Sequence, residues 1–301
     1  MGYALVLGGG GVTGIAWETG LLKGLRDAGA DVTGADVVIG TSAGSFVGAQ
    51  VTAGADLDRL FDEQVALASE TNAPPRADVA PFLQLMAALA AEPDLTLEQL
   101  RTRIGAMALH AEYPVGAAAR LEGLMARLPV REWPDRQLLI TAVDASDGSP
   151  VTWARASGVP LPLAVASSCS VPAITPPVEI LGRRYMDGGM RSATNADLAA
   201  GHDVVVVVAP TGAAPESAPN PLAALAPDSA VAQWATALQR EVAALRAGGA
   251  DVHVIVPDVR ALEAIGFDVF DVGRREAVAR AGLAQGTAAA SALAPALRAG
   301  G

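Results

Sequence analysis

Residues 36–45 read D-V-V-I-G-T-S-A-G-S. A short apolar run typical of a buried strand ends at Gly40, and Ser42 lies between Gly40 and Gly44. The pattern G-x-S-x-G is typical of a sharp strand-to-helix turn that exposes a serine hydroxyl. A helix that begins here directs the positive end of its dipole toward Ser42, which favours negative charge on the serine oxygen. The stretch therefore predicts a nucleophilic serine, with a simple helix cap as the structural alternative.

A glycine-rich loop precedes this turn, with the sequence G-G-G-G-V-T-G at residues 8–14. Gly9, Gly11 and Gly14 satisfy the spacing G-x-G-x-x-G of a dinucleotide-binding loop. Such a site also has an acidic residue at the end of the second strand, where this chain has Gly40 and Thr41. A tight turn is a second minor alternative, and a cradle of N–H groups for a developing anion is favoured over both. A nucleotide- or phosphate-binding protein without hydrolase activity therefore stays an alternative function.

A third stretch, Y-M-D-G-G, covers residues 185–189. A carboxylate at a strand end can approach another loop closely when Gly188 and Gly189 follow it. An isolated match of this kind is usually a simple turn. Asp187 becomes a candidate for chemistry because it follows the glycine loop and the serine turn in the same chain.

In this order the three stretches resemble the patatin-like phospholipase family, and A-S-S-C-S-V-P-A at 166–173 is similar to it as well. The resemblance covers about residues 3–200. It implies a three-layer α/β/α fold with a mostly parallel central sheet. It also implies a serine lipid acyl hydrolase that cleaves carboxylic esters through an acyl-enzyme. Ser42 would be the nucleophile and Asp187 the general base of a Ser-Asp dyad.

The resemblance also implies roles for the glycines. Main-chain N–H groups of an oxyanion hole would come from Gly9, Gly10 and Gly11, and the remaining motif glycines are Gly14, Gly40, Gly44, Gly188 and Gly189. A carboxylate is a weak base at its ordinary pKa, and an apolar pocket raises that pKa.

One residue departs from the family pattern. The chain has Thr13 where the family loop has Arg or Lys, a cation that would steady the loop or meet a phosphate head group. The departure favours a neutral lipid, a lysolipid or a small acyl ester over a phospholipid.

Apolar runs alternate with helical patterns along the chain, which predicts an α/β fold with a parallel sheet. Strands are expected at residues 3–7, 37–39, 138–143, 184–186, 204–208 and 252–256, with a hairpin at 146–155. Five successive valines at 204–208 indicate a strand buried on both faces. Helices are expected from 45–52, 162–168 and 229–246 and from Arg275 onward, and a loop at 211–228. We expect one domain over 1–301, with a helical insertion at about 55–131.

Composition limits the classes of function. Hydrophobic residues make up 51% of the 301 residues, which is enough for a large core. A net charge of -11 argues against a nucleic-acid partner. A single cysteine and no paired Cys/His spacing predict no disulfide, metal or cofactor. The expected partner is a lipid or acyl-ester substrate. No signal peptide or spanning segment is recognisable, so we expect a cytoplasmic protein that can make transient peripheral contact with membranes.

A Ser-His-Asp triad is a competing hypothesis, because Ser42, Asp187 and His253 follow the chain order of α/β-hydrolases. Only two strands precede Ser42, however, and His253 lies in the middle of a predicted strand. We therefore expect a structural histidine there, and surface or capping roles for His110 and His202.

Other residues have competing structural and functional interpretations. Cys169 is expected to be a packing residue. The apolar stripe over Phe82–Leu89 is expected to be a buried helix face, with the wall of an acyl channel or a lipid-docking face as alternatives. Trp17 and Trp153 are expected in the core.

Overall fold

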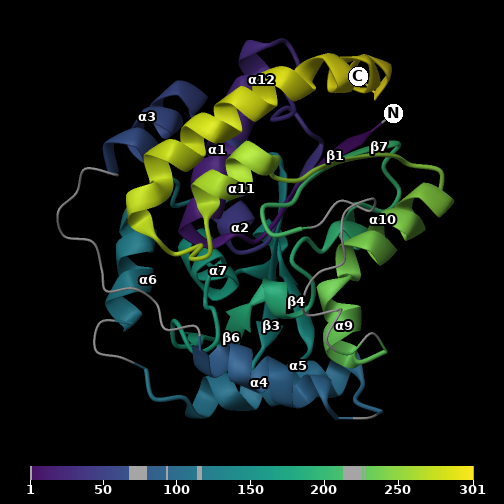
Figure 1. The fold of residues 1–301 in the computed structure, drawn as a ribbon. Coiled ribbons are helices and arrows are strands. Elements are labelled where there is room, and N and C mark those ends of the chain that lie inside the picture. Colours follow the sequence, from purple (N-terminus) through teal and green to yellow (C-terminus); the bar gives the residue numbers. More distant parts are fainter. Residues whose placement is uncertain are drawn as a thin grey trace.

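The computed structural model describes residues 2–67, 80–92, 94–113, 117–212, 226 and 228–300. Within them an eight-stranded sheet runs through the molecule, with helices on both faces (Figure 1). The strand order is β5-β6-β3-β2-β1-β7-β8, and β4 pairs with β3. The strands are β1 (Tyr3–Leu7), β2 (Val37–Gly40), β3 (Gln137–Asp144), β4 (Pro150–Trp153), β5 (Val178–Ile180), β6 (Arg183–Asp187), β7 (Val204–Val208) and β8 (Asp251–Ile255). The predicted three-layer α/β fold is confirmed.

The centre of the sheet is parallel. β1 lies between β2 and β7, and the β2–β3 and β7–β8 pairs are parallel as well. Beyond β3 the pairs are antiparallel, including the predicted hairpin partner β4. Leu7 lies opposite Gly40 in the β1–β2 register. The glycine loop after β1 and the serine turn after β2 therefore leave the same edge of the sheet side by side.

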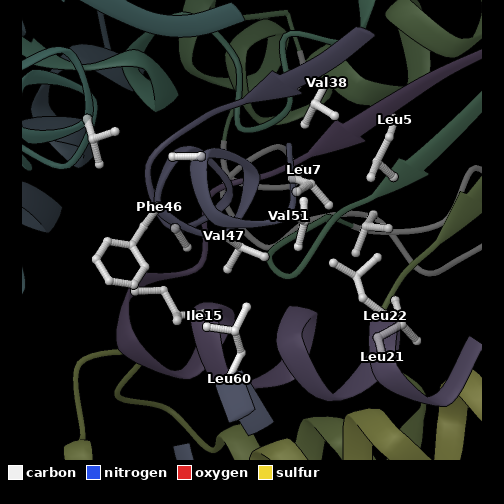
Figure 2. Close-up of a cluster of buried hydrophobic side chains, with 14 of the residues drawn as sticks. Leu5, Leu7, Ile15, Leu21, Leu22, Val38, Phe46, Val47, Val51 and Leu60 are labelled. Atoms are coloured by element: carbon white, nitrogen blue, oxygen red, sulfur yellow. The ribbon is translucent and has the colours of Figure 1, made fainter. Parts of the chain in front are cut away.

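One face of the sheet is covered by the largest apolar cluster. In Figure 2, Leu5, Leu7 and Val38 of the strands meet side chains from the helices, including Phe46 and Val47. Helices that contribute to this cluster include α1 (Gly11–Asp27), α2 (Ala43–Thr52), α3 (Leu57–Leu67), α7 (Leu161–Ser168), α11 (Val259–Ile265) and α12 (Arg275–Gly300). Trp17 and Trp153 are buried in this cluster, as expected.

The opposite face is covered chiefly by α10 (Ala237–Ala247) and by a short 3-10 turn, η3 (Ala196–Ala199). Val205 and Val207 of β7 pack there, while Val206 and Val208 belong to the first cluster. This agrees with burial of the valine strand on both faces. The predicted helix over 229–246 is divided at Thr236 into α9 (Ala230–Ala235) and α10. Most of the predicted loop at 211–228 lies outside the described residues.

The segment between α2 and β3 is helical wherever it is described. It contains α3, α4 (Ala80–Ala90), α5 (Leu97–His110) and α6 (Ala117–Ala126), and no strand among the described residues. Met86 and Leu89 of α4 are buried against a cluster that includes Met186. The Phe82–Leu89 stripe thus supplies a buried face. The division of the chain into one domain with an insertion stays a prediction.

A close helix crossing attaches the C-terminal helix to the start of the fold. A Cβ atom on Gly24 of α1 would lie 2.2 Å from the carbonyl oxygen of Leu283, and one on Gly286 of α12 would lie 2.2 Å from that of Leu21. Small residues let the two backbones approach closely, and Figure 1 shows α12 lying across α1. The crossing fixes the chain that leads into α12, including the turn η4 (Val272–Arg274), near the N-terminus of α1.

Candidate active site

Ser42 has a strained backbone. Its φ of 53° and ψ of -117° are unusual for a residue with a side chain, and such strain costs about 1–3 kcal/mol and collects at functional sites. Ser42 is the N-cap residue of α2, yet its side chain makes no capping hydrogen bond. The helix-cap alternative therefore does not explain the serine.

The motif glycines around Ser42 permit close packing of the turn on β1. A Cβ atom on Gly44 would lie 2.1 Å from the carbonyl oxygen of Leu7, and one on Gly40 would lie 2.6 Å from the Cα of Ser45. No side chain fits at either position. The turn is also connected to the glycine loop, because the N–H of Gly44 donates to the carbonyl oxygen of Gly8 at 3.0 Å.

Asp187 ends β6 and is 2% exposed. Its Oδ1 accepts a hydrogen bond of 2.7 Å from the N–H of Gly189. Its Oδ2 is buried and has no hydrogen-bond partner among the described residues. Gly188 allows the turn to sit against β3, since a Cβ atom there would lie 2.2 Å from the Thr141 hydroxyl. The hydrogen bond to Oδ1 thus fixes the carboxylate, and Oδ2 is available to accept a proton.

The structure brings Ser42 and Asp187 together. Burial raises the pKa of Asp187 to about 7, while the nearby Ser42 hydroxyl and the N–H of Gly189 oppose that rise. A carboxylate with a pKa near the working pH is a far better proton acceptor than an exposed one. This arrangement agrees with the predicted pair.

The amides of the glycine loop differ in their availability. The N–H of Gly9 donates to the carbonyl oxygen of Ala193 at 2.7 Å, so Gly9 is not a free donor for an oxyanion. Gly10 and Gly11 make no such bond with the described residues. Gly11 also has a φ of +60°, which favours glycine. The predicted oxyanion donors are therefore narrowed to Gly10 and Gly11.

Thr13 connects this loop to the C-terminal part of the chain. Its N–H donates to the carbonyl oxygen of Val269 at 3.0 Å, and its buried hydroxyl lies 3.4 Å from the carbonyl oxygen of Gly10. Gly14 packs against Ala43, since a Cβ atom on Gly14 would lie 3.2 Å from the Cβ of Ala43. At the position of the cation in the family pattern, this chain thus has a neutral side chain, and that residue contacts Val269.

Three supporting residues were not predicted from the sequence. Asn195 donates from Nδ2 to the hydroxyl of Thr41 at 3.0 Å and to that of Thr141 at 3.2 Å, which joins the turn after β6 to the serine turn. Trp234 donates from Nε1 to the carbonyl oxygen of Gly189 at 2.8 Å. Ser168 accepts a hydrogen bond from the N–H of Ser42. Of the three, only Ser168 could have been suspected from the sequence, because it lies in the family-like stretch 166–173.

Two cavities meet at Ser42. The first, here called the arginine cavity, has a volume of about 390 Å³ and is mostly apolar, with Ser42, Leu121, Leu124, Arg127, Cys169, Val171, Ile174, Phe270 and Arg275 among its lining. The second, the aspartate cavity, has a volume of about 320 Å³ and includes Gly9, Gly10, Gly11, Ser42, Asp187, Met190, Trp234 and Leu238. Both sizes are typical of small-molecule sites. No residue of α4 is among the described residues that line either cavity.

The histidines lie away from this site. His253 is on the edge strand β8, three strands from β2 or about 14 Å, and its Nε2 is 3.1 Å from Asp251. His110 and His202 contact the carbonyl oxygens of Ala106 and Ala199. The triad hypothesis therefore has no support in the geometry.

Cys169 lies under the serine turn. Its Sγ is 3.3 Å from the carbonyl oxygen of Ser42. Burial, and secondly the Asp187 carboxylate, raise the pKa of its thiol. A neutral thiol is a packing group here. Among the described residues, no three His, Cys, Asp or Glu side chains gather as a metal site requires.

Comparison with protein families gives a match to the model of patatin-like phospholipase over residues 5–200, which is more than half of the chain. The chain belongs to the patatin-like phospholipase family. The matched region contains the glycine loop, the serine turn and Asp187, while Val269, Phe270 and α12 lie beyond it. No curated protein matches the chain.

Two solved structures resemble this patatin-like chain. VipD from Legionella pneumophila has 13% identity and a TM-score of 0.37, over 71% of this chain and 50% of that one. The type III effector protein ExoU has 17% identity and a TM-score of 0.33, over 95% of this chain and 53% of that one. This chain therefore spans about half the length of each. Among the described residues, no helix is long and apolar enough to cross a membrane.

Proposed function

We propose that this patatin-like protein is a serine acyl hydrolase that cleaves carboxylic esters of lipids through a Ser-Asp dyad. The observation that carries the proposal is the buried Asp187 beside the strained Ser42. The carboxylate has one oxygen without a partner among the described residues and a pKa of about 7. Family membership supports a lipid ester as the substrate class.

In the acylation half of the proposed reaction, Oγ of Ser42 attacks the ester carbonyl carbon while Asp187 accepts the serine proton. The carbonyl oxygen becomes an oxyanion next to the N–H groups of Gly10 and Gly11, at the positive end of the α1 dipole. When the tetrahedral intermediate collapses, the bond to the alcohol oxygen breaks. Asp187 returns the proton to that oxygen, and the acyl group stays on Ser42.

In the deacylation half, a water molecule attacks the acyl-enzyme. Asp187 accepts a proton from the water, the bond between the acyl carbon and Oγ breaks, and the serine oxygen regains a proton from Asp187. The products are a carboxylic acid and an alcohol, and both residues return to their starting states. Oxyanion donors in serine hydrolases are worth roughly 10²- to 10³-fold in rate.

Transient contact with a lipid surface is part of the proposal. Val259, Leu262 and Phe267 expose apolar side chains on and after α11, close in sequence to Phe270, which lines the arginine cavity. A net charge of -11 gives no general attraction to anionic lipids. We therefore propose an uncharged or zwitterionic lipid interface, and a cytoplasmic location stays a prediction.

The test is hydrolysis of a lipid panel, with the products identified by mass spectrometry. The panel contains diacyl phospholipids, lysolipids, acylglycerols and soluble acyl esters. We expect the wild type to release a free acid and an alcohol, and Ser42→Ala and Asp187→Asn to lose at least about a hundredfold in rate. Ser291→Ala and Asp135→Asn, both on the surface, are the matched controls. His253→Ala is expected to keep most of the activity.

Wild-type protein that hydrolyses no ester, yet binds a nucleotide or phosphate tightly, would instead favour the alternative function of the glycine loop. The acidic residue that a dinucleotide site uses at the end of the second strand is replaced by Gly40 and Thr41. The segment at Val269 also lies over the loop, since a Cβ atom on Gly11 would be 2.7 Å from the carbonyl oxygen of Val269.

A further inference from the structure

The segment 192–196 contacts all three parts of the proposed catalytic machinery. Its carbonyl groups accept hydrogen bonds from the N–H of Gly9 at 2.7 Å and from the hydroxyl of Thr41 at 3.3 Å. Its Asn195 directs the side-chain nitrogen Nδ2 toward the carbonyl oxygen of Gly188 at 3.4 Å. The glycine loop, the serine turn and the turn after β6 therefore share one neighbour.

The side chain of Asn195 is buried and has a fixed orientation. Its Oδ1 accepts a hydrogen bond of 2.8 Å from Nη1 of Arg191, and Arg191 also donates to Asp197. Because arginine can only donate, this bond requires that Nδ2 be the amide atom on the other side. Asn195 has a φ of 52°, in the left-handed region that asparagine enters more readily than most residues.

On that other side, Nδ2 of Asn195 contacts the residue that precedes the proposed nucleophile. It donates to the hydroxyl of Thr41 at 3.0 Å and to the hydroxyl of Thr141 at 3.2 Å. These two hydroxyl oxygens are 2.8 Å apart. Thr41 is the residue before Ser42, so the serine turn is attached to β3 through a group of three buried side chains.

The same nitrogen reaches the peptide group that binds the proposed base. The carbonyl of the peptide between Gly188 and Gly189 lies 3.4 Å from Nδ2 of Asn195, and it also accepts from the N–H of Arg191 at 3.0 Å. The N–H of that peptide donates to Oδ1 of Asp187 at 2.7 Å. Asn195 therefore contacts the group that orients the carboxylate.

The segment is itself held by a helix on the opposite face of the sheet. Oε2 of Glu241, in α10, accepts from the hydroxyl of Thr194 at 2.8 Å and from the N–H of Ala196 at 2.9 Å. These two residues flank Asn195. The position of Asn195 is thus fixed from both sides, and the amide can transmit that position to the serine turn and to the turn after β6.

We propose that Asn195 is a positioning residue that sets the distance and orientation between the hydroxyl of Ser42 and the carboxylate of Asp187. This inference rests on the proposed function. Asn195 is not among the described residues that line either cavity at Ser42, so it acts through Thr41 and the Gly188–Gly189 peptide. Misplacement of a reacting group by about 1 Å can reduce the rate by about a hundredfold.

The first variant is Asn195→Gly, which removes the amide and lets the backbone keep its left-handed φ without strain. The assay follows a soluble acyl ester, and kcat is expressed per Ser42 that a fluorophosphonate labels at completion, so that unfolded protein is not counted. We expect kcat to fall about ten- to a hundredfold while KM stays within about threefold of the wild type. A purely structural role would lower the amount of labelled enzyme and leave kcat per labelled serine unchanged.

A second pair of variants tests the acceptor of the amide. Thr141→Val removes the hydroxyl at nearly constant shape and should lower kcat by roughly tenfold, whereas Thr141→Ser keeps the hydroxyl and should recover most of it. Thr152→Val is the matched control, because Thr152 lies opposite Thr141 on β4 and is exposed. It is expected to keep the wild-type kcat. If Asn195→Gly does not fold, the Thr141 pair decides alone.

The double variant Asn195→Gly/Thr141→Val tests whether the two residues act through one contact. If they do, its kcat should be lower than that of Asn195→Gly by no more than about threefold, because the contact is already lost. Independent effects would multiply.

Three results would overturn the inference: a wild-type kcat per labelled serine in Asn195→Gly, a Thr141→Ser variant that is no more active than Thr141→Val, or losses that multiply in the double variant. Each of these leaves ester hydrolysis by the wild type intact, so the proposed function would stand. If the wild type hydrolyses neither the soluble ester nor any lipid of the panel, the proposed function fails, and the positioning role fails with it.

Discussion

The main-chain N–H of Ser42 donates a hydrogen bond of 2.9 Å to the hydroxyl of Ser168, which is completely buried at the end of α7. The bond crosses from one side of the serine turn to a segment 126 positions away. It uses the amide of the proposed nucleophile, so that amide cannot also bind an oxyanion. It also gives the strained backbone of Ser42 a fixed partner.

Ser168→Ala removes that acceptor and leaves a buried N–H group unsatisfied. A loss of this kind costs about 1–3 kcal/mol. We expect a lower free energy of unfolding and a kcat reduced more strongly than KM changes, because the serine oxygen is less well positioned. Ser168→Thr keeps a hydroxyl and should recover part of the kcat. Unchanged unfolding and unchanged kcat in Ser168→Ala would contradict the positioning role.

The pH dependence of the reaction follows from Asp187. The proposed base works as a carboxylate, and burial raises its pKa to about 7. We expect kcat/KM to fall about tenfold for each pH unit below that value and to be flat above it. The measurement is an initial-rate profile on a soluble ester whose own ionisation does not change in this range. A profile that is level down to about pH 5 would contradict the raised pKa.

Glu18 is expected to make the free energy of unfolding depend on pH. The side chain is fully buried in α1, neither of its carboxylate oxygens has a hydrogen-bond partner among the described residues, and burial raises its pKa well above 4.5. When folding raises the pKa of a carboxyl group, the folded state holds its proton to higher pH than the unfolded chain does. The free energy of unfolding therefore falls as the pH rises above the pKa of the unfolded chain. The destabilisation caused by burying Glu18 therefore grows as the pH rises above 4.5.

Glu18→Gln removes this titration. We expect the Tm of Glu18→Gln relative to the wild type to rise between about pH 5 and pH 8. Glu122→Gln, on the exposed surface of α6, is the control and should show no such trend. A Tm difference for Glu18→Gln that is constant across this range would show that the buried group does not govern the stability change.

The crossing of α1 and α12 predicts a strong effect of a single methyl group. Gly286→Ala places a Cβ atom 2.2 Å from the carbonyl oxygen of Leu21, so the helices must separate. Overpacking of this kind costs about 1–3 kcal/mol. Gly123→Ala in α6 adds a methyl where nothing lies within 4 Å and should instead be neutral or stabilise by up to about 1 kcal/mol. Urea unfolding measures both, and equal effects would contradict the close crossing.

Much of the sheet was predictable because its signals are local. The valine run of β7, the apolar run before Gly40 and the alternation of strands and helices identified the α/β fold and most of its elements. The three-residue strand β5 and the seven-residue helix α11 were not predicted, since short elements carry little periodicity. Helix α6 lies within the predicted helical insertion but was not delimited, and the break at Thr236 left no local signal.

The site was predicted only in part. Ser42 and Asp187 stood out because glycines are required where backbones pack closely, and that requirement is visible in the sequence. The loss of Gly9 as a free donor was not visible, because it depends on a bond to Ala193 from a distant loop. Val269 contacts Thr13 across 256 positions, and Trp234 contacts Gly189 as a single residue outside any motif. Such contacts exist only once the chain has folded.

The dyad is tested most directly by covalent labelling with a fluorophosphonate, followed by mass-spectrometric mapping of the modified peptide. The account predicts a single adduct on Ser42, none in Ser42→Ala, much slower labelling in Asp187→Asn, and wild-type labelling in Ser291→Ala. An adduct on another residue, or labelling of Ser42 at the same rate in Asp187→Asn as in the wild type, would contradict it.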